Sequence, residues 1–142
     1  MEDKILVGLN DSMILDSNNP VGYARDISTC MVILVHRKNS STLMHVESYD
    51  NRIELDVFFA AMKPDKDNPI TSVDIFTGND TTPGNLSIIQ FVLHRYNIPY
   101  TVRQIFRNNS NETSVGYNFL TKEYYMARMH DGKPTLTRKR ID

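Results

Sequence analysis

The chain has 142 residues, of which 40% are hydrophobic and 23% are charged, which is typical of one compact domain with its own core. Its 16 basic and 17 acidic residues nearly balance, which argues against a dominantly electrostatic grip on nucleic acid or on an anionic membrane. We see no signal peptide and no apolar run of membrane-spanning length, and the one cysteine cannot form an internal disulfide, so we expect a cytoplasmic protein.

The first half of the chain predicts strands and one helix. Short apolar or β-branched runs predict strands at 4–7, 12–15, 31–35 and 42–47. The polar stretch at 17–22 predicts a loop, and Lys-Asn-Ser-Ser at 38–41 predicts a turn. A helix is predicted over 52–63, with Asp50 as its cap and Pro64 as its end.

The second half predicts a second helix and more strands. Alternating or β-branched segments predict strands at 72–76, 99–106, 115–119 and 123–129. The helix is predicted over 85–96, where apolar residues such as Leu86, Ile89 and Leu93 recur at helical spacing. Thr121-Lys122 is predicted to turn the last hairpin, and residues 138–142 are predicted to be a solvated or frayed end.

This order of elements predicts an α+β fold in one domain spanning residues 1–142. We expect β-sheets packed as a sandwich, with two helices on the outer faces. A parallel dinucleotide-binding sheet is not expected, because the strands and helices alternate too little and neither GxGxxG nor GxxxxGK[ST] occurs.

Cys30 and His45 are the candidate catalytic residues. Cys30 follows two small hydroxyl residues where a loop becomes a strand, so neighbouring backbone N–H groups can point at a developing oxyanion. His45 lies on the next predicted strand, sharing one side with Leu43 and Glu47. The alternative is a buried thiol that acts as a small hydrophobic residue beside an unrelated imidazole.

Direct contact between Cys30 and His45 depends on the turn between their strands. A tight turn at Asn39-Ser40 would pair Cys30 with Tyr49, about 13 Å along the strand from His45. Contact requires a wider loop centred near Arg37-Lys38, a bulge, or a cysteine that folds back from the strand end. These alternatives stay open in the sequence.

The other histidines are weaker partners for the cysteine. His36 is six residues along the same strand, roughly 20 Å away if the chain is extended. His94 is placed on the second helix with a surface role, and His130 is placed in a turn. No CxxC or HExxH spacing occurs, so we expect no metal and no cofactor.

The segment Asp-Ile-Ser-Thr-Cys-Met-Val-Ile-Leu-Val at 26–35 resembles the nucleophile strand of three related groups of cysteine amidohydrolases. They are the eukaryotic protein N-terminal asparagine amidohydrolases, the bacterial chemoreceptor glutamine deamidase CheD, and the catalytic domains of cytotoxic necrotizing factor toxins. The Thr-His pair that follows in the first group matches Met44-His45 here. The resemblance implies a cysteine deamidase fold in which Cys30 and His45 are catalytic.

The resemblance covers roughly residues 5–129. Residues 72–78 resemble the strand before the CheD-type loop, 83–93 the helix that follows, and 114–125 the closing hairpin. The chain departs from CheD at Ala24, where CheD-like enzymes carry a threonine that orients the histidine. Asp26 and Ser28 are possible substitutes for this third group.

The resemblance implies hydrolysis of a Gln or Asn carboxamide on a protein substrate, through a thioester on Cys30. The loops 16–25, 77–84 and 108–113 would surround such a site. One alternative is an N-terminal asparagine amidase, in which Asp26 or Glu47 would read the free amino group. Another is a non-catalytic binding module on the same fold. Neither nucleic acid nor a membrane is expected as a partner.

Overall fold

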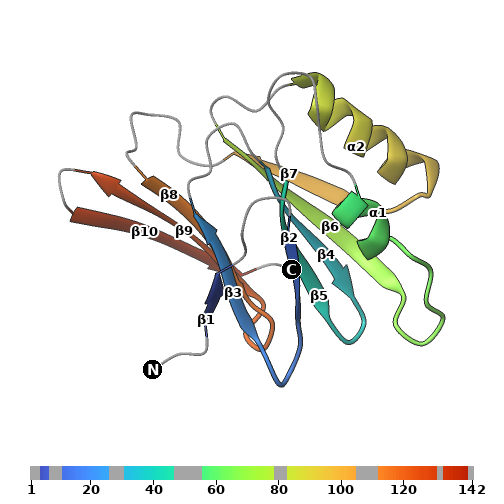
Figure 1. Cartoon of the computed structure of the whole chain (residues 1–142), viewed down its shortest axis with the longest axis horizontal. Coiled ribbons are helices and arrows are strands. Elements are labelled where there is room, and N and C mark those ends of the chain that lie inside the picture. Colours follow the sequence, from blue (N-terminus) through green and yellow to red (C-terminus); the bar gives the residue numbers. More distant parts are fainter. Residues whose placement is uncertain are drawn as a thin grey trace.

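The computed structural model describes residues 4–6, 11–25, 31–46, 56–78, 83–104, 112–130 and 133–140. Within these ranges the chain forms two five-stranded sheets and two helices (Figure 1). The fold is therefore mostly β-sheet with two helices, which agrees with the predicted α+β class.

The first sheet has the strand order β1-β3-β8-β9-β10. Its strands are β1 (Lys4–Leu6), β3 (Val21–Arg25), β8 (Glu112–Asn118), β9 (Glu123–His130) and β10 (Lys133–Arg140). β1 pairs with β3 in parallel, and the other neighbours are antiparallel.

The second sheet has the strand order β2-β5-β4-β6-β7. Its strands are β2 (Asp11–Leu15), β5 (Ser41–Val46), β4 (Met31–Arg37), β6 (Ile70–Thr77) and β7 (Tyr100–Gln104). The parallel pair β6 and β7 is connected through helix α2 (Pro83–Arg95), whereas β4 and β6 are antiparallel.

Alternate residues of the central strand β4 contribute to two hydrophobic clusters. Val32 and Leu34 belong to a cluster that also contains Val115 and Tyr117 of the first sheet, so this cluster joins the two sheets. Met31, Ile33 and Val35 belong to the other cluster, which contains residues of both helices. Because both faces of β4 are covered, its first six residues are all buried, as the apolar run in the sequence predicts.

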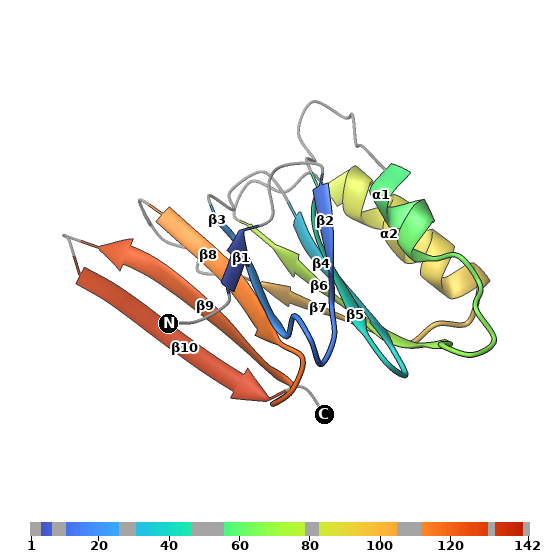
Figure 2. The ribbon, with the colours of Figure 1, turned by 60° about the horizontal axis from the view of Figure 1, so that its bottom comes forward.

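Both helices pack on the same face of the second sheet, the face turned away from the first sheet (Figures 1 and 2). Phe58 of α1 (Asp56–Ala61) and Ile89 and Leu93 of α2 are fully buried there. The prediction of helices on more than one outer face therefore differs from the described structure. The predicted cap Asp50 lies outside the described residues.

Two strands of the first sheet were not predicted. Residues 17–22 were expected to be a loop, but Asp16 closes a short turn over residues 16–19 and β3 begins at Val21. Residues 138–142 were expected to be frayed, but Arg138, Lys139 and Arg140 pair with β9. β10 escaped prediction because edge strands carry the charged residues and proline that typically signal loops.

Candidate functional site

The β4–β5 hairpin determines where His45 lies. Arg37 N–H donates to the carbonyl of Ser40 at 2.7 Å, so the turn is centred on Lys38-Asn39. In this register Val32 lies opposite His45, and Met31 lies opposite Val46. The turn therefore lies midway between the two positions that the sequence allowed, Asn39-Ser40 and Arg37-Lys38. It places His45 across from Val32, which follows Cys30 by two positions in the sequence.

His45 is 5% exposed and lies on the side of the second sheet that faces the first sheet. Its neighbour at alternate spacing, Leu43, belongs to the cluster between the sheets, as does Val32 opposite. Side chains alternate between the two faces of a strand, so the imidazole has the same facing as these two residues. The predicted facing of Leu43 and His45 on one side is confirmed.

Cys30 lies outside the described residues, as do Asp26, Ser28 and Glu47. In the sequence Cys30 is the residue before Met31, and the β4–β5 register pairs Met31 with Val46.

Asp11 is a residue near His45 that the sequence argument missed. β2 pairs with β5 on the side away from β4, and its register places Asp11 directly opposite His45. The alternating residues Met13 and Leu15 face the cluster between the sheets, which gives Asp11 the same facing as His45. Directly paired side chains have Cβ atoms about 5 Å apart. Asp11 lies just outside the strand that the sequence predicted over 12–15, and nothing local revealed its pairing with β5.

Ala24, the position at which the chain differs from CheD-like enzymes, lies on β3 of the first sheet. Ala24 is fully buried in the cluster between the sheets and pairs with Val115. A methyl side chain there offers no group that could orient an imidazole. Asp11, rather than a residue at position 24, is the polar neighbour that the strand register provides for His45.

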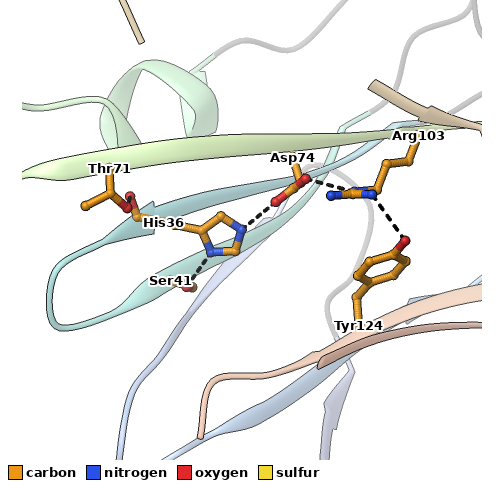
Figure 3. A network of polar contacts seen from close by, with 6 residues as sticks. All are labelled: His36, Ser41, Thr71, Asp74, Arg103 and Tyr124. Atoms are coloured by element: carbon orange, nitrogen blue, oxygen red, sulfur yellow. Dashed lines mark hydrogen bonds and ion pairs between the residues drawn. The ribbon is translucent and has the colours of Figure 1, made fainter. Parts of the chain in front are cut away.

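A second group of polar side chains, which we call the buried polar network, lies between the sheets (Figure 3). His36 on β4 contacts Ser41 Oγ through Nδ1 and Asp74 Oδ2 through Nε2, each at 2.8 Å. Asp74 on β6 also accepts a hydrogen bond from Arg103 Nε at 2.8 Å. Arg103, on β7, donates to Tyr124 Oη of the first sheet at 3.2 Å. The network therefore links four strands of the second sheet to the first sheet.

The contacts of the network match its donors and acceptors. An ionised carboxylate only accepts, so in the contact with such a carboxylate Nε2 of His36 donates to Asp74, and the Ser41 hydroxyl, which can donate or accept, contacts Nδ1. The Arg103 guanidinium lies 4.8 Å above the Tyr124 ring and compensates the Asp74 charge. Every polar group in this chain of contacts thus has a partner suited to its charge.

Ser41, His36 and Asp74 are the residue types of a hydrolytic triad, but their burial favours a structural role. Ser41 is 1% exposed and Asp74 is 3% exposed. The ring of Tyr117 covers His36 at a centroid distance of 5.2 Å. A hydroxyl buried in this way cannot contact a substrate carbonyl, which a nucleophile must do. The network compensates the buried charge of Asp74 between the sheets.

The sequence contained only a weak signal for this network, namely polar residues next to or inside apolar runs. His36 ends an apolar run and Asp74 interrupts one, and a charged residue inside a buried strand requires a partner. His36 was weighed only against Cys30, and Asp74 was passed over within its strand. Of the remaining histidines, His94 is exposed on α2 as expected, whereas His130 ends β9 instead of lying in a turn.

The comparisons add no family to this geometry. Neither of the two helices in the described part of the chain is long and apolar enough to cross a membrane. The sequence matches no protein-family model and no curated protein.

Proposed function

We propose that this chain is a cysteine-dependent deamidase that converts a Gln or Asn carboxamide on a protein substrate into a carboxylate. The observation that supports the proposal is the β4–β5 register. It pairs His45 with Val32, which follows Cys30 by two residues in the sequence, so the proposal sets the thiol diagonal to the imidazole. A diagonal pair across antiparallel strands is within reach of long or aromatic side chains.

The proposal includes the fold implied by the resemblance. The two sheets share a hydrophobic cluster, and β4, which follows Cys30 in the sequence, pairs with β5, which contains His45. We infer that they form the sandwich of the CheD and cytotoxic necrotizing factor deamidases. The resemblance implies a catalytic cysteine and histidine on neighbouring strands, and β4 and β5 are neighbours in the second sheet.

The chemistry follows from the thiol and the imidazole. A free thiol has a pKa near 8.5, and an adjacent imidazolium keeps it ionised at neutral pH. The Cys30 thiolate attacks the carboxamide carbon, and backbone N–H groups stabilise the oxyanion. His45 gives its proton to the leaving nitrogen, so ammonia departs and a thioester remains. His45 then takes a proton from water, which attacks the thioester and releases the carboxylate and the thiol.

Asp11 takes the part of the third group in this proposal. Its position opposite His45, on the same face of the second sheet, suits a carboxylate that orients the imidazole and stabilises its charged form. His45 thus lies between the strand of the nucleophile on one side and a carboxylate on the other. This order matches the roles of nucleophile, base and orienting acid.

Alkylation of the single cysteine with iodoacetamide tests the proposal, because each protein molecule can gain only one label at cysteine. We expect rapid labelling well below pH 8, slowed at least tenfold in His45→Ala and less strongly in Asp11→Asn. His94→Ala, an exposed histidine on α2, is the matched control and should label like wild type. Mass spectrometry measures the label, and circular dichroism confirms folding.

Ammonia release identifies the substrate class. Folded proteins with internal Gln should release ammonia in the presence of wild type and not of Cys30→Ala. Slow labelling of Cys30 that His45→Ala leaves unchanged would contradict the proposed site. Ammonia release only from peptides with an N-terminal Asn would instead identify an N-terminal amidase.

A further inference from the structure

A cavity of about 590 Å³ lies at the other end of the second sheet from His45. It is bounded by the C-terminal end of α1, the connection over residues 62–70, and residues 92–98 at the end of α2. This volume is within the range of small-molecule sites, which usually are concave and mostly apolar. The cavity is separate from the proposed deamidase site, because Arg37, which lines it, is five residues along β4 from Val32, the partner of His45, a span of about 17 Å.

The inner wall of the cavity is apolar. Its side chains include Phe59, Met62, Val92, Tyr96 and Ile98. Phe59 is 49% exposed and Tyr96 is 64% exposed, so large aromatic surfaces at this wall face solvent. An apolar ligand would remove this surface from water, and burial of that kind is favourable by about 25 cal/mol per Å².

The cavity is preformed by hydrogen bonds that fasten the 62–70 connection to the β4–β5 hairpin. The Arg37 guanidinium donates to the carbonyls of Ala61, Lys63 and Asn68. The Asn68 side chain accepts from Asn39 N–H at 2.7 Å and donates to Ser40 Oγ at 3.0 Å. A wall held in this way does not have to be ordered by the ligand, which lowers the cost of binding.

The charges around the cavity are mainly positive. Four basic residues line it, namely Arg37, Lys63, Lys66 and Arg95, against the single carboxylate of Asp65. Lys63, Lys66 and Arg95 are exposed, so their charges are free to meet a ligand from solvent. The chain as a whole has a net charge of -1, so this excess is a local property of the cavity.

We propose that this cavity binds a monomeric amphiphilic carboxylate, of the chemical class of medium-chain fatty acids. The alkyl chain lies along Phe59, Met62 and Val92, and the carboxylate lies among Lys63, Lys66 and Arg95. The concave wall favours a single small ligand over a flat membrane surface. The combination of an apolar wall and a cationic edge selects an anion with a tail over a neutral amphiphile or a simple anion.

Isothermal titration calorimetry of the full chain with dodecanoate, below its micelle concentration, tests this proposal. We expect micromolar binding, at least tenfold weaker binding of dodecanol, and weaker dodecanoate binding at higher salt. Lys63→Gln/Lys66→Gln should weaken dodecanoate binding at least fivefold. The matched control is Arg138→Gln/Lys139→Gln, which removes two exposed charges from β10 of the first sheet. Phe59→Ala tests the apolar wall and should also weaken binding.

Several outcomes would overturn the inference. They are an absence of heat with dodecanoate, equal binding of dodecanol, or equal losses in the two double variants. Binding to phosphatidylglycerol vesicles without binding of the monomer would identify a membrane surface instead. None of these measurements depends on deamidase activity, so their failure is distinguishable from a failure of the proposed reaction.

Discussion

Asp74 is the residue on which the buried polar network depends. It is 3% exposed and accepts from both His36 and Arg103, each at 2.8 Å. Removal of one partner from a buried ion pair leaves the other charge without compensation, which typically costs more than the pair itself contributes. Since the Arg103 side chain is 27% exposed, water screens part of that cost.

We expect Asp74→Ala to lower the free energy of unfolding by about 3 kcal/mol in urea titrations. Arg103→Met in the Asp74→Ala background should recover part of this loss, because it removes the uncompensated cation. Asp67→Ala, at an exposed aspartate, should change the stability by less than about 0.5 kcal/mol. Equal small effects at Asp74 and Asp67 would show that the network contributes nothing to stability.

At the scale of elements, the first sheet depends on an aromatic contact at a glycine. Gly116 on β8 pairs with Tyr125 on β9 and with Tyr23 on β3. A Cβ placed at Gly116 would collide with the ring of Tyr125, so the tyrosine covers the space that glycine leaves open. Cross-strand cover of this kind offsets the poor strand propensity of glycine.

We expect Gly116→Ala to destabilise the protein by about 1–2 kcal/mol, because the added methyl group displaces the Tyr125 ring. In a Tyr125→Ala background the same substitution should be neutral or stabilising by up to about 1 kcal/mol, since alanine has less backbone freedom to lose on folding. Thermal unfolding of the four proteins in a double-mutant cycle measures the coupling. An equal loss in both backgrounds would place the cause in the backbone and not in the ring.

The strands and helices also show which elements local sequence patterns can predict. β4, β5, β6 and α2 were predicted to within about two residues, because each carries a run of buried apolar residues with a clear period. β3 was missed because five residues with a glycine have no such period, and its stability comes from pairing with β1 and β8. Strand partners were not predictable, because they depend on residues far away in the sequence.

At the scale of the whole molecule, the buried Tyr117 and the half-buried Tyr125 make the stability of the fold depend on alkaline pH. Burial raises the pKa of Tyr117, its hydrogen bond with Ser41 partly offsets the rise, and the Asp74 carboxylate raises the pKa further. Burial and the nearby Tyr23 also raise the pKa of Tyr125, which Arg138 partly opposes. The folded state therefore holds these two phenolic protons more tightly than the unfolded chain does.

We expect the free energy of unfolding to fall as the pH rises above about 10, the pKa of an unfolded tyrosine. Above that pH the unfolded state releases protons that the folded state retains, and the stabilisation is lost as pH rises through the raised folded pKa. Urea titrations between pH 8 and 11 measure the slope. Tyr117→Phe should flatten it, whereas Tyr96→Phe, at an exposed tyrosine, should not. An unchanged slope in Tyr117→Phe would refute the assignment.

The sequence by itself determined the α+β class, the main strands and helices, and the facing of Leu43 and His45, because these depend on local periodicity and propensity. Only the tertiary structure decided the strand order, the position of the β4–β5 turn, and the placement of both helices on one face. It also brought His36, Asp74 and Arg103 together, and set Asp11 opposite His45. These features arise from pairings between distant segments, where backbone hydrogen bonds and burial of the shared core select one register among several that local patterns allow.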